Sequence, residues 1–186
     1  MAQHTLSVLV ENSPGVLARV ASLFSRRGYN IDSLAVGPTE SPEISRITIV
    51  LNLEGHALDQ VSAQLFKLVN VIGIQEMEDK NSHQRELLMV KVSSAGDNRS
   101  KIEAVVGKYR ASIVSQASSS LTIEAIGSSA EIAALLGELS GFGIKELVQS
   151  GLIALEIGDA TLAERTLQET GLASSSTHSQ TEDYQN

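Results

Sequence analysis

The residues best suited to chemistry lie in one short segment, Glu11-Asn12-Ser13-Pro14-Gly15-Val16-Leu17. The segment joins a stretch of alternating apolar residues to a stretch with helical spacing, so it is a strand-to-helix turn. Pro14 has no N–H, and those of Gly15, Val16 and Leu17 stand at the helix start, where they lack intrahelical acceptors. Two interpretations fit these residues: a capped turn with a glycine for tight packing, or, with the helix dipole, a site for an anion. Because Gly15 has no Cβ, a ligand carboxylate can approach the backbone closely.

A second turn, Gly28-Tyr29-Asn30-Ile31, follows the same helix, and the amide of Asn30 can both donate and accept hydrogen bonds. The two turns lie at opposite ends of the helix, roughly 20 Å apart, so they cannot meet within one chain. They can meet across a two-fold axis, where one patch faces a different patch of the mate. We therefore expect a homodimer in which a small zwitterion contacts one chain through its carboxylate and the other through its ammonium group and side chain.

Other reactive groups are sparse. The chain has no cysteine, which excludes disulfides, thiolate nucleophiles and Cys-ligated metals. It has no Gly-x-Ser-x-Gly elbow and no Walker lysine, and Gly141-Phe142-Gly143 lies between a helix and a strand, the wrong order for a dinucleotide loop. The four histidines are scattered, without metal-ligand spacing: His4, His56, His83 and His178. We expect no catalytic residue, metal or cofactor in this chain.

The charge balance argues against two classes of partner. The chain carries 22 acidic and 14 basic residues, a net charge of -8. A nucleic-acid binder needs a basic face, and anionic lipid attracts basic segments, so we expect neither partner. RNA-recognition domains stack bases on strand aromatics, whereas these strands carry Val, Ile and Leu. No apolar run approaches the ~18 residues of a membrane span. The N-terminus does not resemble a secretory signal, so we expect a cytoplasmic protein.

The hydrophobic pattern predicts the elements that hold the two turns. Residues 1–78 follow the order strand-helix-strand-strand-helix-strand, which is typical of ferredoxin-like folds. Ser13 is the expected N-cap of the first helix, Pro14 its first residue and Gly28 its left-handed C-cap. The predicted strands cover 6–10, 31–36, 44–52 and 71–77, and the helices carry Val16, Val20, Leu23 and Phe24, and Leu58, Val61, Leu65 and Leu68.

The same order recurs in the second half of the chain. We predict an α+β protein with tandem domains at 1–78 and 85–158, joined by a polar linker at 79–84. Residues 152–157 either extend the last strand or pair back on it. A short helix over 160–170 and a Ser/Thr/Gln-rich tail with little to bury, expected to be disordered, complete residues 159–186. The second-domain strands are predicted at 85–93, 111–115, 121–126 and 144–148, with helices around 102–109 and 132–139.

Several segments, in this order, resemble the small, regulatory subunits of acetohydroxyacid synthase (acetolactate synthase), which begin with an ACT domain. Besides 11–17, they are Leu-Phe-Ser-Arg-Arg-Gly-Tyr-Asn-Ile-Asp-Ser-Leu at 23–34, Ser-Arg-Ile-Thr-Ile-Val at 45–50 and Gln-Leu-Phe-Lys-Leu-Val-Asn-Val at 64–71. Arg-Glu-Leu-Leu-Met-Val-Lys-Val at 85–92 resembles the start of that family's second domain. The resemblance covers residues 4 to about 157.

The resemblance implies an N-terminal ACT domain that dimerises and binds the effector, and an ACT-like C-terminal domain that helps to activate a large subunit. The chain would be a non-catalytic regulator in branched-chain amino-acid biosynthesis. It would bind the large catalytic subunit, raise its activity and confer feedback inhibition by valine. Thiamine diphosphate, Mg and FAD are then expected on the catalytic subunit. The family's effector residues match Asn12, Gly15, Val16, Leu17, Asn30 and Ile31.

Two departures from the family bear on C-terminal contacts: Gln149 stands where the family often has Arg, and the tail beyond Gly158 is longer than usual. Two other functions remain open. A free-standing amino-acid sensor, acting on another enzyme, a transporter or a transcription factor, would share the first turn without a thiamine-enzyme partner. An enzyme in its own right would turn over substrate alone. The effector also stays open among valine, leucine and isoleucine, because one methylene is worth only ~1–3 kcal/mol.

Overall fold

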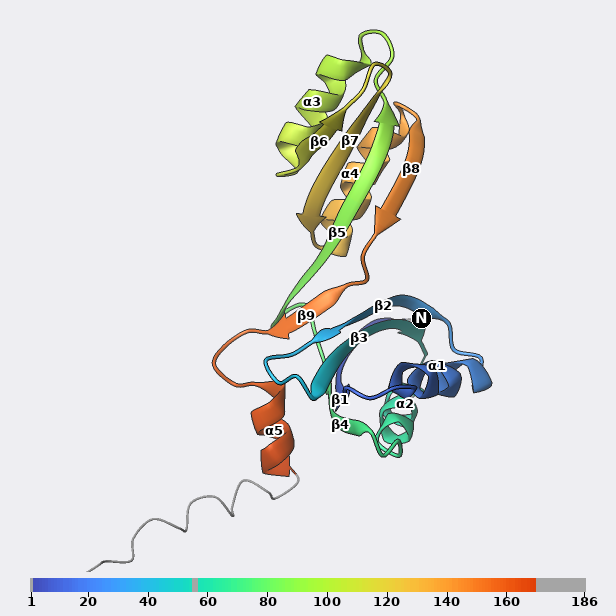
Figure 1. Cartoon of the computed structure of the whole chain (residues 1–186), viewed down its shortest axis with the longest axis vertical. Helices are drawn as coiled ribbons and strands as arrows, with labels where there is room; N and C mark the ends of the chain where they lie inside the picture. Colours follow the sequence, from blue (N-terminus) through green and yellow to red (C-terminus); the bar gives the residue numbers. More distant parts are fainter. Residues whose placement is uncertain (1, 55–56, 170–186) are drawn as a thin grey trace, which may run out of the picture.

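Two antiparallel sheets, each with a pair of helices on one face, make up most of the chain (Figure 1). This computed structural model describes residues 2–54 and 57–169. Both units have the order strand-helix-strand-strand-helix-strand, which confirms the α+β class and the tandem ferredoxin-like domains. A further strand and a further helix follow the second unit.

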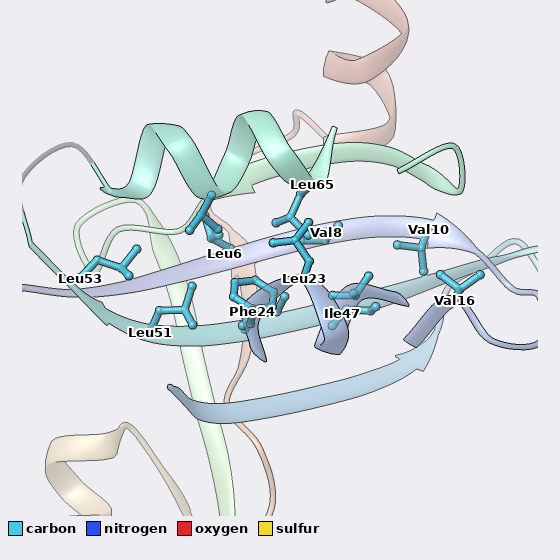
Figure 2. Close-up of a cluster of buried hydrophobic side chains, with 13 residues drawn as sticks. Leu6, Val8, Val10, Val16, Leu23, Phe24, Ile47, Leu51, Leu53 and Leu65 are labelled. Carbon is cyan, nitrogen blue, oxygen red and sulfur yellow. The ribbon is translucent and has the colours of Figure 1, made fainter. Parts of the chain in front are cut away.

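The N-terminal sheet has the strand order β2-β3-β1-β4. Alternate residues of β1 and β3, such as Val8 and Ile49, face the helices and are fully buried. Figure 2 shows this core, with Phe24 of the first helix lying over the sheet among Leu23, Ile47 and Leu51. The elements are β1 (Ala2–Glu11), α1 (Val16–Arg26), β2 (Ile31–Pro38), β3 (Ile44–Leu53), α2 (Ala57–Leu65) and β4 (Val71–Glu76).

The start of α1 differs from the expected capped turn. Ser13 does not cap the helix and Pro14 is not its first residue: α1 begins at Val16, and Gly15 is the N-cap, with φ 83° and ψ -5° and no side-chain hydrogen bond. Ser13 to Val16 instead form a type II turn, in which the Val16 N–H donates to the Ser13 carbonyl at 3.4 Å. Proline then glycine at the central positions favours this turn, because glycine tolerates the positive φ. That preference outweighs the capping tendency of Ser13.

The end of α1 follows the prediction. Gly28 has φ 70°, and its N–H donates to the Ser25 carbonyl at 3.2 Å. The Tyr29 N–H donates to the Phe24 carbonyl at 3.1 Å, which completes a Schellman motif. Gly28 therefore turns the chain sharply from α1 into Asn30 and β2.

The second sheet has the order β6-β7-β5-β8, and its β5 begins at Ser82, inside the segment 79–84 that we expected to be a linker. Residues 82–85 extend past β7 and β8 and pair with β9. Both expectations for residues 152–157 are therefore wrong: residues 153–156 neither extend β8 nor pair back on it, but pair with β5. The elements are β5 (Ser82–Ser93), α3 (Asn98–Lys108), β6 (Ser112–Gln116), β7 (Ser120–Gly127), α4 (Ser129–Ser140), β8 (Ile144–Gln149) and β9 (Ile153–Glu156).

The short helix expected near the C-terminus is present as α5 (Leu162–Glu169), and the predicted tail from 172 onward lies outside the described residues. Thr161 and Glu164 form a capping box at its start, and the hydrogen bond from Thr161 lowers the pKa of Glu164. The helix packs against β4, on the sheet face opposite α1 and α2, where Thr166 is buried over Gly73. α5 is thus part of the N-terminal fold.

Adding a methyl group at Gly73 should detach α5. A Cβ there would collide with the Thr166 hydroxyl and lie 3.3 Å from the Thr166 Cβ. We expect Gly73→Ala to speed hydrogen exchange of the α5 amides, measured by mass spectrometry, at least tenfold. In Gly73→Ala/Thr166→Ala the colliding hydroxyl is gone, so slow exchange should return. Equal exchange in Gly73→Ala and the parent would show that α5 does not depend on this contact.

Candidate functional site

The first turn presents open backbone donors at the surface. Asn12, Gly15 and Leu17 are exposed, and among the described residues beyond its chain neighbours no heavy atom lies within 4 Å of the place that a Cβ on Gly15 would take. In the described part of the chain, no acceptor lies within hydrogen-bond reach of the Gly15 and Leu17 N–H groups. The third predicted donor, Val16, already closes the type II turn, and its side chain is buried in the core. Two of the three predicted N–H groups are therefore open to an anion.

The side chain of Asn12 anchors this turn to the loop before β3. Its Nδ2 donates to the Pro42 carbonyl at 2.9 Å, and its backbone N–H donates to the Glu43 carbonyl at 2.7 Å. Among the residues the structure describes, no donor reaches the Asn12 Oδ1. Asn12 thus holds the turn with its donors and leaves a carbonyl oxygen for a ligand.

Asn30, in the second turn, is arranged in the same way. Its Nδ2 donates to Asp32 Oδ1 at 2.8 Å, while Asn52 donates to the other oxygen of Asp32. Asn30 is exposed and Ile31, the first residue of β2, is half-buried. The Asn30 carbonyl oxygen has no donor within the described ranges, so it can accept a hydrogen bond from an ammonium group.

A polar network behind the first turn was not found from the sequence. Asn70 Nδ2 donates to Glu11 Oε2 at 2.5 Å, and Arg19 Nη1 donates to Asn70 Oδ1 at 2.6 Å. The Glu11 N–H also donates to the Asn70 carbonyl at 2.9 Å. These bonds tie the start of α1 to the start of β4. Because Asn70 is 59 residues from Glu11, local spacing carries no sign of the contact.

Within one chain the six predicted site residues form two separate groups. Asn12, Gly15, Val16 and Leu17 lie at the start of α1, and Asn30 and Ile31 lie beyond its end. The 11 residues of α1 put roughly 16 Å between the groups. As expected, no single chain brings the two groups together.

The residues that the structure describes include neither a metal site nor a membrane-spanning helix. No group of three or more His, Asp or Glu side chains there could hold a metal ion. None of the helices there is long and apolar enough to cross a membrane.

Comparison with known families matches both halves of the chain. The family model for the AHAS small subunit-like ACT domain matches residues 6–73. The family model described as the small subunit of acetolactate synthase matches residues 85–158.

Several individual proteins are similar along most of their length. The acetolactate synthase small subunit of Mycolicibacterium smegmatis is 52% identical over 155 residues, which is 83% of this chain and 91% of the relative. The probable acetolactate synthase small subunit of Methanothermobacter thermautotrophicus is 42% identical over 160 residues, or 86% and 95%. The crystal structure of the acetolactate synthase small subunit from Thermotoga maritima has a TM-score of 0.79 and 30% identity, covering 86% of this chain and 100% of that one.

Proposed function

The chain belongs to the family of acetolactate synthase small subunits, and from this membership we propose that it makes the catalytic subunit sensitive to valine. It is a regulatory subunit and not a catalytic one. We propose that it binds the catalytic subunit in the cytoplasm, raises its activity and lowers it again when valine accumulates. Thiamine diphosphate, Mg and FAD belong to the catalytic subunit in this proposal. The open N–H groups of Gly15 and Leu17 at the start of α1 are the observation that carries the effector site.

The groups at the two turns suit the two charged ends of an amino acid. The N–H groups of Gly15 and Leu17, at the positive end of α1, would bind the carboxylate. The carbonyl oxygen of Asn30 would accept from the ammonium group, and Leu17 and Ile31 supply apolar surface for the side chain. Valine has about eight heavy atoms, which at roughly -0.3 to -1.5 kcal/mol per atom allows micromolar to millimolar affinity. Affinity in that range suits a protein that responds to the concentration of a metabolite.

A two-fold dimer through the edge of β2 would bring the two turns together. β2 is an edge strand of the described sheet, where it pairs with β3 alone. Asn30 precedes its first residue, and the first turn contacts residues 42–43, close to its last residue, Pro38. If two β2 edges pair antiparallel, the start of one strand lies beside the end of the other. Each effector site would then take its carboxylate donors from one protomer and Asn30 from its mate.

Reconstitution tests the proposed function directly. The chain is mixed with an acetolactate synthase catalytic subunit loaded with its cofactors, and acetolactate formation is followed while valine, leucine or isoleucine is titrated. We expect several-fold activation and inhibition with valine as the most effective ligand. Valine binding should depend on the dimer, whose mass is measured by sedimentation. Valine binding without activation of the catalytic subunit would favour a free-standing amino-acid sensor.

A further inference from the structure

The second domain leaves one face of its sheet without helices. On β5, Leu88, Val90 and Val92 are buried in the core with residues of α3 and α4. Both helices lie on the same side of this sheet (Figure 1). The residues between them point the other way: Leu87 is 36% exposed and Met89 38%. An antiparallel sheet facing water on one side normally carries polar residues there. The outward-facing β5 residues Leu87 and Met89 are apolar instead, although Glu124 of β7 lies opposite Met89 on the same face.

The strand register shows that the exposed apolar residues are neighbours. Leu87 lies opposite Ile126 of β7, and Met89 lies opposite Val148 of β8. Towards the N-terminal domain the row continues on β9, where Ile153 pairs with Arg85 and Leu155 with His83. The exposed fractions of Ile126, Val148, Ile153 and Leu155 all lie between 60% and 62%. We call these residues the β5 strip: Leu87, Met89, Ile126, Val148, Ile153 and Leu155.

A pocket lies at the N-terminal-domain end of the β5 strip. Its volume is about 440 Å³, and it lies between β2 and β3 of the first sheet and the paired strands β5 and β9. Ile153, Leu155 and Pro38 line it with apolar surface, and Arg46 and Arg85 add guanidinium groups. In the described part of the chain, no carboxylate is within salt-bridge distance of either arginine. Their hydrogen bonds go to the Ser7 hydroxyl and the Gln84 carbonyl.

We propose that the β5 strip is the surface on which the catalytic subunit docks, placing an apolar side chain in the pocket and a carboxylate against Arg46 and Arg85. The partner's identity rests on the proposed function, and the surface rests on the structure. A contiguous exposed apolar patch of this kind marks an interaction site, and a pocket gives an anchor residue a fully desolvated position.

Charge complementarity selects the partner. The chain is acidic overall, yet within the described residues no carboxylate lies within salt-bridge distance of either pocket arginine, so an acidic segment on a partner would complement them. At the far end of the β5 strip, Lys91 and Glu146 pair with each other at 2.9 Å, and the hydrogen bond from Lys91 lowers the pKa of Glu146. Glu146 is therefore already paired within the chain. An acidic and apolar segment of the catalytic subunit meets both requirements.

The position of β2 gives this surface a connection to the effector site. β2 starts beside Asn30, and its last residues, 35–38, line the pocket. In its middle, the Ser33 hydroxyl accepts a hydrogen bond from the Leu152 N–H at 2.8 Å, in the segment that leads into β9. A ligand that shifts the start of β2 can thus reach the docking surface through one strand.

Charged substitutions on exposed residues of the β5 strip test the surface. Full-length Ile126→Glu and Val148→Glu are compared with Val69→Glu, whose parent side chain is 86% exposed and lies outside the strip. Affinity for the catalytic subunit is measured by surface plasmon resonance, and valine binding to the chain alone by calorimetry. We expect at least a tenfold loss of affinity in the two strip variants, with unchanged valine binding. Val69→Glu should behave like the parent.

Each other outcome has a distinct meaning. Normal binding and activation by both strip variants would overturn the docking surface and leave the regulatory role standing. Without the catalytic subunit, Ile126→Glu could instead sediment with half the mass of the parent and still bind the catalytic subunit as before. The face would then be an interface between copies, and the proposal would be wrong. A parent chain that does not bind the catalytic subunit would overturn the proposed function itself.

Discussion

A Gly15→Asp chain is expected to activate the catalytic subunit fully while having lost its response to valine. The new carboxylate would stand where the carboxylate of valine approaches the Gly15 and Leu17 N–H groups. Two like charges about 4 Å apart repel by about 4 kcal/mol at an effective dielectric constant of 20. We therefore expect the valine concentration for half-inhibition to rise at least ~100-fold. The surface available for docking on the second domain is unchanged.

Gly15→Asn is the matched control. Asparagine has the same size as aspartate and, like it, enters the left-handed region that φ 83° requires at this position. Within the described ranges no atom beyond the chain neighbours would meet the new Cβ, so neither variant should unfold the chain. Valine inhibition curves of the reconstituted enzyme should show a much smaller shift for Gly15→Asn. If Gly15→Asp kept normal valine sensitivity, the first turn would not be the effector site.

Local patterns in the sequence identified the elements but not all of their partners. The alternation of Ile47, Ile49 and Leu51 predicted β3 and its buried face, and Gly28 predicted the end of α1, because these features depend on neighbouring residues. The pairing of β9 with Ser82–Arg85 could not be predicted, since alternation shows that a strand exists but not which edge it joins. The start of α1 was mispredicted because Ser13 suits a cap as well as a turn.

In the candidate site, too, features with a local sequence pattern were predicted and contacts between distant residues were not. Gly15 and Asn30 were predicted as site residues from residue type and position, because open N–H groups and amides have local signatures. Asn70, which orients the first turn through Glu11 and Arg19, was missed because that contact is formed only by the fold. The packing of Thr166 on Gly73 was missed for the same reason.

Gly151→Ala is the second substitution with a large expected effect, because it should separate valine binding from inhibition. Gly151 lies against the backbone of β2: a Cβ there would collide with the Leu34 carbonyl and the Ala35 nitrogen, which cannot rotate away. The segment 151–152 should move off β2 and lose the hydrogen bond from the Leu152 N–H to the Ser33 hydroxyl. Loss of that bond and the resulting strain should lower the free energy of unfolding by about 1–3 kcal/mol.

Because β2 connects Asn30 to the docking surface, Gly151→Ala should weaken inhibition more than valine binding. Asn30 and the first turn are untouched, so the dissociation constant of valine for the chain, measured by calorimetry, should change less than twofold. The half-inhibitory concentration of the reconstituted enzyme should rise about tenfold, which corresponds to a loss of ~1.4 kcal/mol of coupling. Ser33→Ala removes the hydrogen bond without the collision and should give a smaller rise. A loss confined to transmission must leave valine binding unchanged. If Gly151→Ala raised the dissociation constant and the half-inhibitory concentration of valine by the same factor, this contact would shape the effector site and would not transmit its occupancy.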